Sequence, residues 1–182
     1  DVTATLALAR ALRSADKVLF DELLSMRFKA CVEALVDTNA MKPLVYVSGL
    51  MGTERACLGI IAPLAVHPEY KSDIICADLS REPDFLAMAP EEIQARLFAK
   101  GDELASPSDR PGLMTIKVNK APVLLPTQHI SPDIAARLGL DGDSLRRNLA
   151  MLRKARDDRG SEFLRHLQSV YHGGPKATDS NP

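Results

Sequence analysis

The chain has 182 residues, of which 46% are hydrophobic and 26% are charged, the balance of one folded domain of ordinary size, which excludes disorder as its main state. Its 23 Lys and Arg against 24 Asp and Glu give a formal charge of −1, so any nucleic-acid site must be a local patch and not a property of the whole molecule. The longest apolar stretches fall far short of the roughly 20 residues that span a bilayer, and we expect a cytoplasmic monomer without membrane contact.

Apolar residues at helical spacing open the chain. The pattern predicts one helix over residues 1–15 and a second over residues 16–36, with Asp16 as the N-cap of the second. The first helix begins at Asp1, which is not methionine and has no cap before it. We therefore expect a segment of a longer protein.

Proline and glycine divide the middle of the chain into strands. Pro43 forbids continuation of a helix, and the β-branched and aromatic run after it predicts a strand that ends at Gly49. Further extended segments and one short helix follow by the same reasoning. The predicted strands are 44–48, 58–67, 73–79, 114–118 and 121–125, and the predicted helix is 90–99.

Helical signals return after the last predicted strand. Ser131 is predicted to cap a helix over residues 132–138, and Asp143 or Ser144 to cap another that reaches about residue 156. A final helix is predicted over residues 162–171. Residues 173–182 have nothing to bury and are predicted to be a linker or a disordered tail. The pattern indicates an α+β fold: a small β-barrel with a helical insertion, flanked by helices at both ends.

The sequence carries few signs of catalytic chemistry. It has no nucleophile elbow, no phosphate-binding glycine loop and no zinc-protease motif. We interpret His67, before Pro68, as a turn or packing residue. The three cysteines lie among apolar residues without metal-binding spacing, which predicts buried free thiols. They are Cys31, Cys57 and Cys76.

The cations are unevenly distributed. Residues 110–132 contain three basic and no acidic residues. The helix after residue 143 carries two pairs of cations seven residues apart, Arg146 with Arg153 and Arg147 with Lys154. Two interpretations stay open for this helix: a solvated face with local ion pairs, or a surface that contacts phosphates or an acidic peptide.

Four separated segments resemble, in order and spacing, the bacterial exodeoxyribonuclease I family. They are residues 1–9 (DVTATLALA), 41–49 (MKPLVYVSG), 62–68 (APLAVHP) and 118–124 (VNKAPVL). Residues 137–140 and 148–153 fit the same family.

The resemblance implies a Mg²⁺-dependent exonuclease that degrades single-stranded DNA from 3′ to 5′ into mononucleotides. It places Asp1 on the last of four metal-binding acids, the other three and a general-base histidine lying upstream. Residues 1–15 would be the C-terminal helix of the catalytic domain and residues 16–172 an SH3-like domain that embraces the DNA. Because one carboxylate cannot hold two catalytic ions, the chain alone should be inactive.

The resemblance also gives roles to several polar residues in the matched segments and in the loops between strands. Lys42, Arg55, Asn119 and Lys120 are predicted to contact DNA phosphates. Arg153 matches a position where the family binds the acidic tail of the single-stranded DNA-binding protein. Two alternatives remain, a protein-interaction module and a purely structural clamp wall without DNA affinity of its own.

Overall fold

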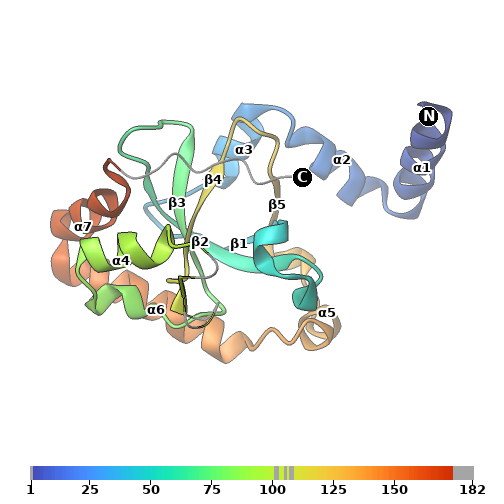
Figure 1. Ribbon diagram of the computed structural model, residues 1–182. Coiled ribbons are helices and arrows are strands. Elements are labelled where there is room, and N and C mark those ends of the chain that lie inside the picture. The colour runs from blue at the N-terminus through green and yellow to red at the C-terminus, as the bar shows by residue number, and fades with distance from the viewer. Residues whose placement is uncertain (1, 101–102, 105, 107–108, 174–182) are drawn as a thin grey trace.

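The computed structural model describes residues 2–100, 103–104, 106 and 109–173 (Figure 1). Asp1, predicted as a metal ligand, and nearly all of the predicted tail over 173–182 lie outside the described residues.

Five strands form one antiparallel sheet. The strands are β1 (Leu44–Val47), β2 (Leu58–Val66), β3 (Asp73–Asp78), β4 (Leu113–Lys117) and β5 (Val123–Pro126). Their order in the sheet is β4-β3-β2-β1-β5, so four consecutive strands form a meander and the fifth returns beside the first. The first half of β2 pairs with β1 and the second half with β3, with an irregular register between Pro63 and Ala65. β2 bends at this point, as Pro63 predicts.

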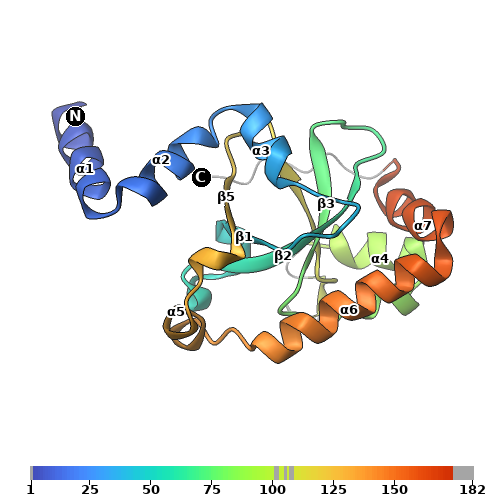
Figure 2. The same ribbon diagram turned by 180° about the vertical axis from the view of Figure 1, so that it is seen from behind.

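Helices cover both faces of the sheet (Figures 1 and 2). They are α1 (Val2–Ala15), α2 (Lys17–Ser25), α3 (Lys29–Leu35), α4 (Pro90–Leu97), α5 (Pro132–Arg137), α6 (Gly142–Arg159) and α7 (Ser161–Tyr171). Short 3₁₀ turns include η1 (Gly49–Met51), η2 (Thr53–Arg55), η3 (Asp84–Ala87) and η5 (Thr127–His129). Strand side chains alternate between the two faces of the sheet. One set packs with Met26 and helix α3, and the other packs with α4, α6 and α7, against which Leu19 and Leu23 of α2 also lie.

The α1–α2 arm projects from the side of this core (Figures 1 and 2). No residue of α1 is buried. Arg13 bridges the elbow between the two helices by donating from Nε to Asp21 Oδ1 at 3.1 Å. Farther along, His129 Nε2 lies 2.8 Å from Glu22 Oε2, which joins α2 to the turn after β5.

The sequence predicted one helix over 16–36, and this prediction is wrong at its centre. The Asp16 cap is confirmed, with its carboxylate accepting from Leu19 N at 2.9 Å. The helix stops at Ser25, however, and Phe28 has extended backbone at φ −95° and ψ 117°. The break lets Met26 and Val32 both pack against the sheet, which a straight helix would not allow.

The remaining elements follow the predicted order. The α+β class, the helical insertion between β3 and β4, and the helices at both ends are confirmed. The cap of α6 is Asp141, not Asp143 or Ser144, since its side chain accepts from Asp143 N. Among the described residues, no helix is both long and apolar enough to span a membrane.

Candidate nucleic-acid interface

Lys42 lies at the entrance to β1 on a tightly fixed backbone. The Asp37 carboxylate accepts from the backbone N–H groups of Asn39 and Ala40 at 2.9 and 2.8 Å, and Lys42 N donates to Asp37 O at 3.2 Å. Met41 is 0% exposed and has a left-handed φ of 47°. The Lys42 side chain is therefore exposed, while its backbone is held in place by the buried Met41 beside it.

Asn119 and Lys120 are exposed in the turn from β4 to β5. Val118 N, at the start of the turn, donates to Ser72 O at 2.9 Å, and Lys120 N donates to Lys117 O at 3.2 Å. These bonds fix the turn against the neighbouring β2–β3 connection. The exposed Asn119 and Lys120 side chains thus extend from a backbone that hydrogen bonds hold in place.

The structure does not bring Lys42 and Lys120 together. In the β1–β5 ladder Leu44 pairs with Pro126 and Val47 pairs with Val123. Lys42 precedes Leu44, whereas Lys120 precedes Val123 at the other end. With a rise of about 3.3 Å per residue, the two lysines are on the order of 20 Å apart along the strands.

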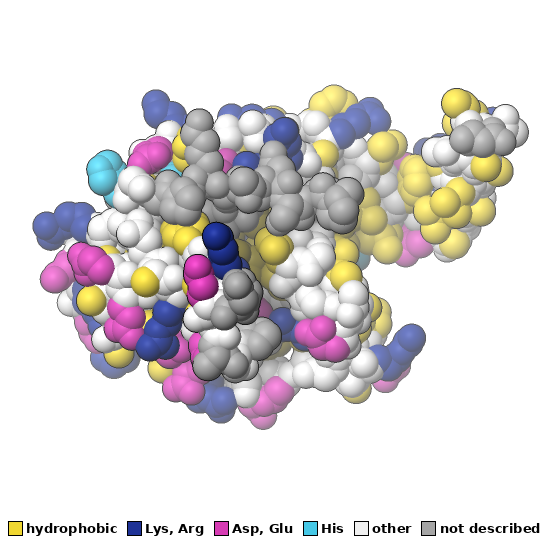
Figure 3. Space-filling view, viewed as in Figure 1, with side chains coloured by type: hydrophobic (Ala, Val, Ile, Leu, Met, Phe, Trp, Pro, Cys, Tyr) yellow, Lys and Arg dark blue, Asp and Glu magenta, His cyan; other side chains and the backbone are white. Residues whose placement is uncertain are grey.

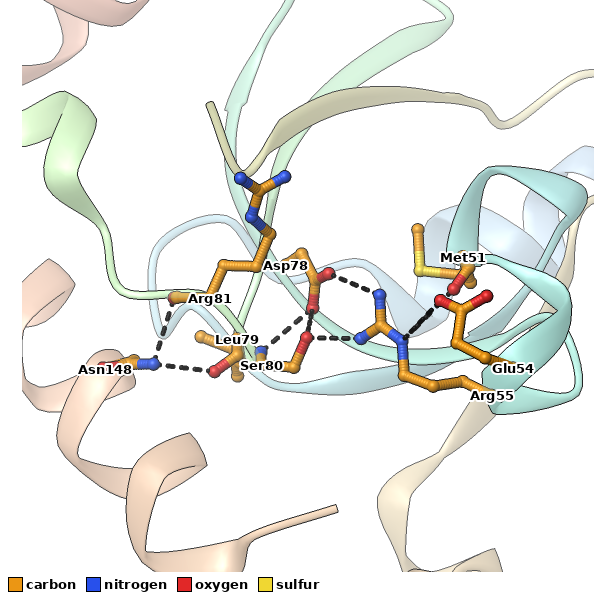
Figure 4. Close-up of polar contacts among 8 residues, drawn as sticks. All are labelled: Met51, Glu54, Arg55, Asp78, Leu79, Ser80, Arg81 and Asn148. Atoms are coloured by element: carbon orange, nitrogen blue, oxygen red, sulfur yellow. Dashed lines mark hydrogen bonds and ion pairs between the residues drawn. The ribbon is translucent and has the colours of Figure 1, made fainter. Parts of the chain in front are cut away.

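Arg55 is embedded in a polar network between the β1–β2 loop and the end of β3 (Figure 4). Its Nε donates to Met51 O at 3.2 Å, one terminal nitrogen donates to Asp78 Oδ2 at 3.3 Å, and the other donates to Ser80 Oγ. Asp78 is only 4% exposed, and it also accepts from Ser80 N and Ser80 Oγ. Arg55 is half-buried and neutralises a buried carboxylate, a role that its predicted place in a loop between strands did not suggest.

Asn148 of α6 fastens the other side of the same segment. Its Nδ2 donates to Leu79 O at 2.9 Å and to Arg81 O at 3.0 Å (Figure 4). Because Asn148 is buried, its side-chain amide, and not water, donates the hydrogen bonds to these two carbonyl groups.

The α6 cations divide into two groups. Arg146, Arg147 and Lys154 bond within the helix, to Asp143, Ser144 and Asp158. For these three cations the structure agrees with the first interpretation, a solvated helix face with local bonds. Arg153 instead donates to Ala40 O, from Nε at 3.2 Å and from a terminal nitrogen at 2.8 Å.

Two further α6 arginines also bond to distant backbone. Arg156 donates to Asn39 O, and Arg159 donates to Leu86 O at 2.9 Å. A shallow open groove of about 520 Å³ runs along the exposed side of α6, and its lining residues, which include Leu149, Arg153 and Lys154, all belong to this helix.

On the face shown in Figure 3, charged side chains are scattered, whereas apolar side chains gather in one region. On the face shown, Lys and Arg are interspersed with Asp and Glu and do not form one basic field. Apolar side chains gather on the α1–α2 arm, where Leu6, Leu8 and Leu12 are exposed. On this face the positive sites are therefore local, as the net charge predicts.

The described residues contain no group of three or more His, Cys, Asp or Glu side chains that could hold a metal ion. All three cysteines are free, as predicted, but Cys31 and Cys57 are only half-buried, so the prediction of burial is wrong for these two. Cys76 is fully buried, which raises its thiol pKa far above the ordinary value. His67 is the predicted turn residue.

Sequence reasoning missed the structural roles of Asp78, Asn148 and Arg156. The sequence pattern indicates only a strand residue at Asp78 and the end of a charged helix at Arg156. Their partners lie 23 to 117 residues away in sequence, so no local spacing reveals them. For Asp78 one signal existed, an acid within an apolar strand, which is rarely buried without a partner.

The sequence profile of the exonuclease I SH3-like domain matches residues 27–172. The chain belongs to this family. The family and the SH3-like class predicted from the four matched segments are thereby confirmed. Exodeoxyribonuclease I of Haemophilus influenzae is 40% identical over 162 residues, which are 87% of this chain but 34% of that protein.

Solved structures of the Escherichia coli enzyme share the fold. In complex with a dA16 oligonucleotide, that enzyme matches 97% of this chain and 37% of its own at a TM-score of 0.86 and 30% identity. A complex of exonuclease I with the SSB C-terminus matches 100% of this chain and 38% of its own chain, at a TM-score of 0.84 and 29% identity. The Escherichia coli enzyme is also solved as a zinc-bound complex with single-stranded DNA. The chain thus spans about a third of the length of these relatives.

Proposed function

We propose that this chain is the SH3-like accessory part of a longer 3′ to 5′ exonuclease that degrades single-stranded DNA to mononucleotides. The match of the family over residues 27–172 carries the proposal. In it the chain forms a wall that embraces the DNA, and the upstream catalytic domain supplies the chemistry. Cytoplasmic location and a monomeric state belong to the same proposal.

Contact with DNA would come through separate phosphate sites. Lys42 and the Asn119–Lys120 turn combine exposure with a fixed backbone, so little conformational entropy is lost when a phosphate binds. Arg55 belongs to the same predicted set, although its bonds to Asp78 and Ser80 leave fewer donors for DNA. Phosphate contacts of this kind carry no base preference.

A divalent metal serves the reaction in this proposal, with Mg²⁺ as the specific ion. The described residues do not form its site, and Asp1 would contribute one ligand to a centre completed by the catalytic domain. The 182-residue chain alone should therefore release no nucleotides from single-stranded DNA in Mg²⁺.

Two measurements check this prediction. Nucleotide release should be absent for the chain and present for the full-length protein, and Asp1→Ala in the latter should abolish turnover while leaving DNA binding nearly unchanged. Release by the chain that persists after Asp1→Ala would contradict the proposal.

The acidic tail of a single-stranded DNA-binding protein is the proposed protein partner. Arg153 borders the groove on α6, and two of its nitrogens already donate to Ala40 O, so docking would use the remaining N–H donors. A tail peptide should lose affinity for the Arg153→Ala protein.

A further inference from the structure

Helix α6 fastens the loop that leads into β1. Arg153 donates twice to Ala40 O, and Arg156 donates to Asn39 O. The two arginines lie one turn apart on α6 and hold adjacent carbonyl groups from the same side. These bonds connect residues more than 110 positions apart in sequence.

The loop transmits this fastening directly to Lys42. Between the held carbonyls and Lys42 lies only Met41, which is buried and left-handed, and Pro43 fixes φ on the other side. A rotation at Asn39 or Ala40 would have to pull Met41 out of the core or change the direction of Lys42. With Arg153 and Arg156 in place, neither movement is favourable.

We propose that Arg153 and Arg156 are positioning residues that aim Lys42 at a phosphate of single-stranded DNA. The inference rests on the proposed function. Arg156 need not touch the DNA, since its side chain is 26% exposed and its guanidinium contacts Asn39 O and Asp157. Its contribution would be to reduce the freedom that Lys42 loses on binding.

Substitution by lysine separates positioning from simple attraction. Lysine keeps the positive charge but lacks the planar, rigid donor group of arginine. If Arg156 acted only through its charge, Arg156→Lys would bind DNA as the native protein does. If Arg156 aims Lys42, the same variant should lose the Lys42 contact.

The experiment measures binding of an oligo-dT strand to the full-length protein over a range of salt concentrations. Lys42→Ala and Arg156→Lys should each weaken binding roughly two- to fivefold, as expected for one exposed ionic contact. Each should also reduce the log-log salt slope by up to about 0.7. The double variant should be no weaker than Lys42→Ala alone.

The matched control is Arg159→Lys. Arg159 lies on the same helix and also donates to a carbonyl, but that carbonyl belongs to Leu86, outside the loop before β1. Its substitution should leave the salt slope unchanged. Arg153→Lys is a second positioning variant if Arg156→Lys does not fold, and the melting temperature of every variant checks folding.

Each outcome decides a separate point. A normal slope for Arg156→Lys beside a reduced slope for Lys42→Ala would overturn the positioning role and leave the proposed function standing. Additive losses in the double variant would also overturn it, because the two residues would act independently. No effect of Lys42→Ala would remove Lys42 from the DNA path and the inference with it.

Discussion

The imidazole of His67 sits in the turn between β2 and β3, where its Nδ1 accepts from Glu69 N at 3.1 Å and from Tyr70 N at 3.2 Å. Its ring also packs against Tyr70 and Tyr171. Desolvation by burial lowers the His67 pKa, and the charges of Asp73 and Glu69 offset this only in part. Protonation would also remove the acceptor that holds the turn.

The His67 pKa shift predicts a direction of pH dependence. A group whose pKa is lower in the folded state stabilises fully above its unfolded pKa, near 6.5 for histidine, and this stability is lost as pH falls through the folded pKa. We expect His67→Asn, whose amide oxygen can accept the same bonds without titrating, to lose less unfolding free energy than the native chain between pH 7.5 and 5.5. Urea unfolding at both pH values checks this, and equal losses would exclude His67 as a contributor.

Arg55 and Asp78 form the second residue-scale case. Arg55→Ala removes the charged donor of the buried Asp78 carboxylate and leaves it the backbone and hydroxyl donors of Ser80, so it should lower the free energy of unfolding by about 2 kcal/mol. In a double-mutant cycle with Asp78→Asn, the two losses should be strongly non-additive.

The control for this cycle is Arg96→Ala, which removes an exposed pair with Glu92 and should cost less than about 0.5 kcal/mol. Additive losses for Arg55 and Asp78 would show that their bond contributes little.

At the scale of elements, α1 and α7 both carry apolar residues at helical spacing, but only those of α7 are buried in the core of this chain. Leu167 of α7 is 0% exposed in the core, whereas Leu8 of α1 is 61% exposed. We expect Leu167→Ala to cost about 2–5 kcal/mol of unfolding free energy and Leu8→Ala to cost under about 0.5 kcal/mol in this chain.

Chemical denaturation of the two leucine variants tests this contrast. In the full-length protein, Leu8→Ala should cost clearly more, because the proposed catalytic domain would cover the apolar face of α1. An equally small loss there would leave that face without a partner.

Element order could be predicted from the sequence because proline, glycine and caps act locally. Pro43, Pro63 and the Ser131 cap each mark a boundary or bend that the structure keeps. The break at residues 26–28 could not be predicted, since no proline or glycine stands there and packing of Met26 on the sheet decides it. Local propensity yields to tertiary burial at such points.

For the candidate site, the sequence predicted exposure and position but not partners. Lys42, Asn119 and Lys120 are exposed beside strand ends, as expected. The bonds of Arg55, Arg153 and Arg156 join parts of the chain that only the fold brings together. The matched segments, and not the charge pattern, indicated the family.

At the scale of the whole molecule, the separation of Lys42 and Lys120 predicts how they share DNA binding. The two lysines lie beyond opposite ends of the β1–β5 ladder, so their contacts should be independent. For single strands each lost phosphate contact lowers the log-log salt slope by about 0.7, and the Lys42→Ala, Lys120→Ala double variant should lower it by about 1.4. Base preference should hardly change.

Titration of DNA affinity against salt in the full-length protein, with each single variant beside the double, is the measurement that checks this. Processive runs should shorten more than the chemical step slows, because neither lysine belongs to the proposed metal centre. A structural clamp wall predicts instead a slightly lower melting temperature and an unchanged slope. If a folded double variant kept the native slope, the lysines would lie outside the DNA path and the clamp-wall alternative would be favoured.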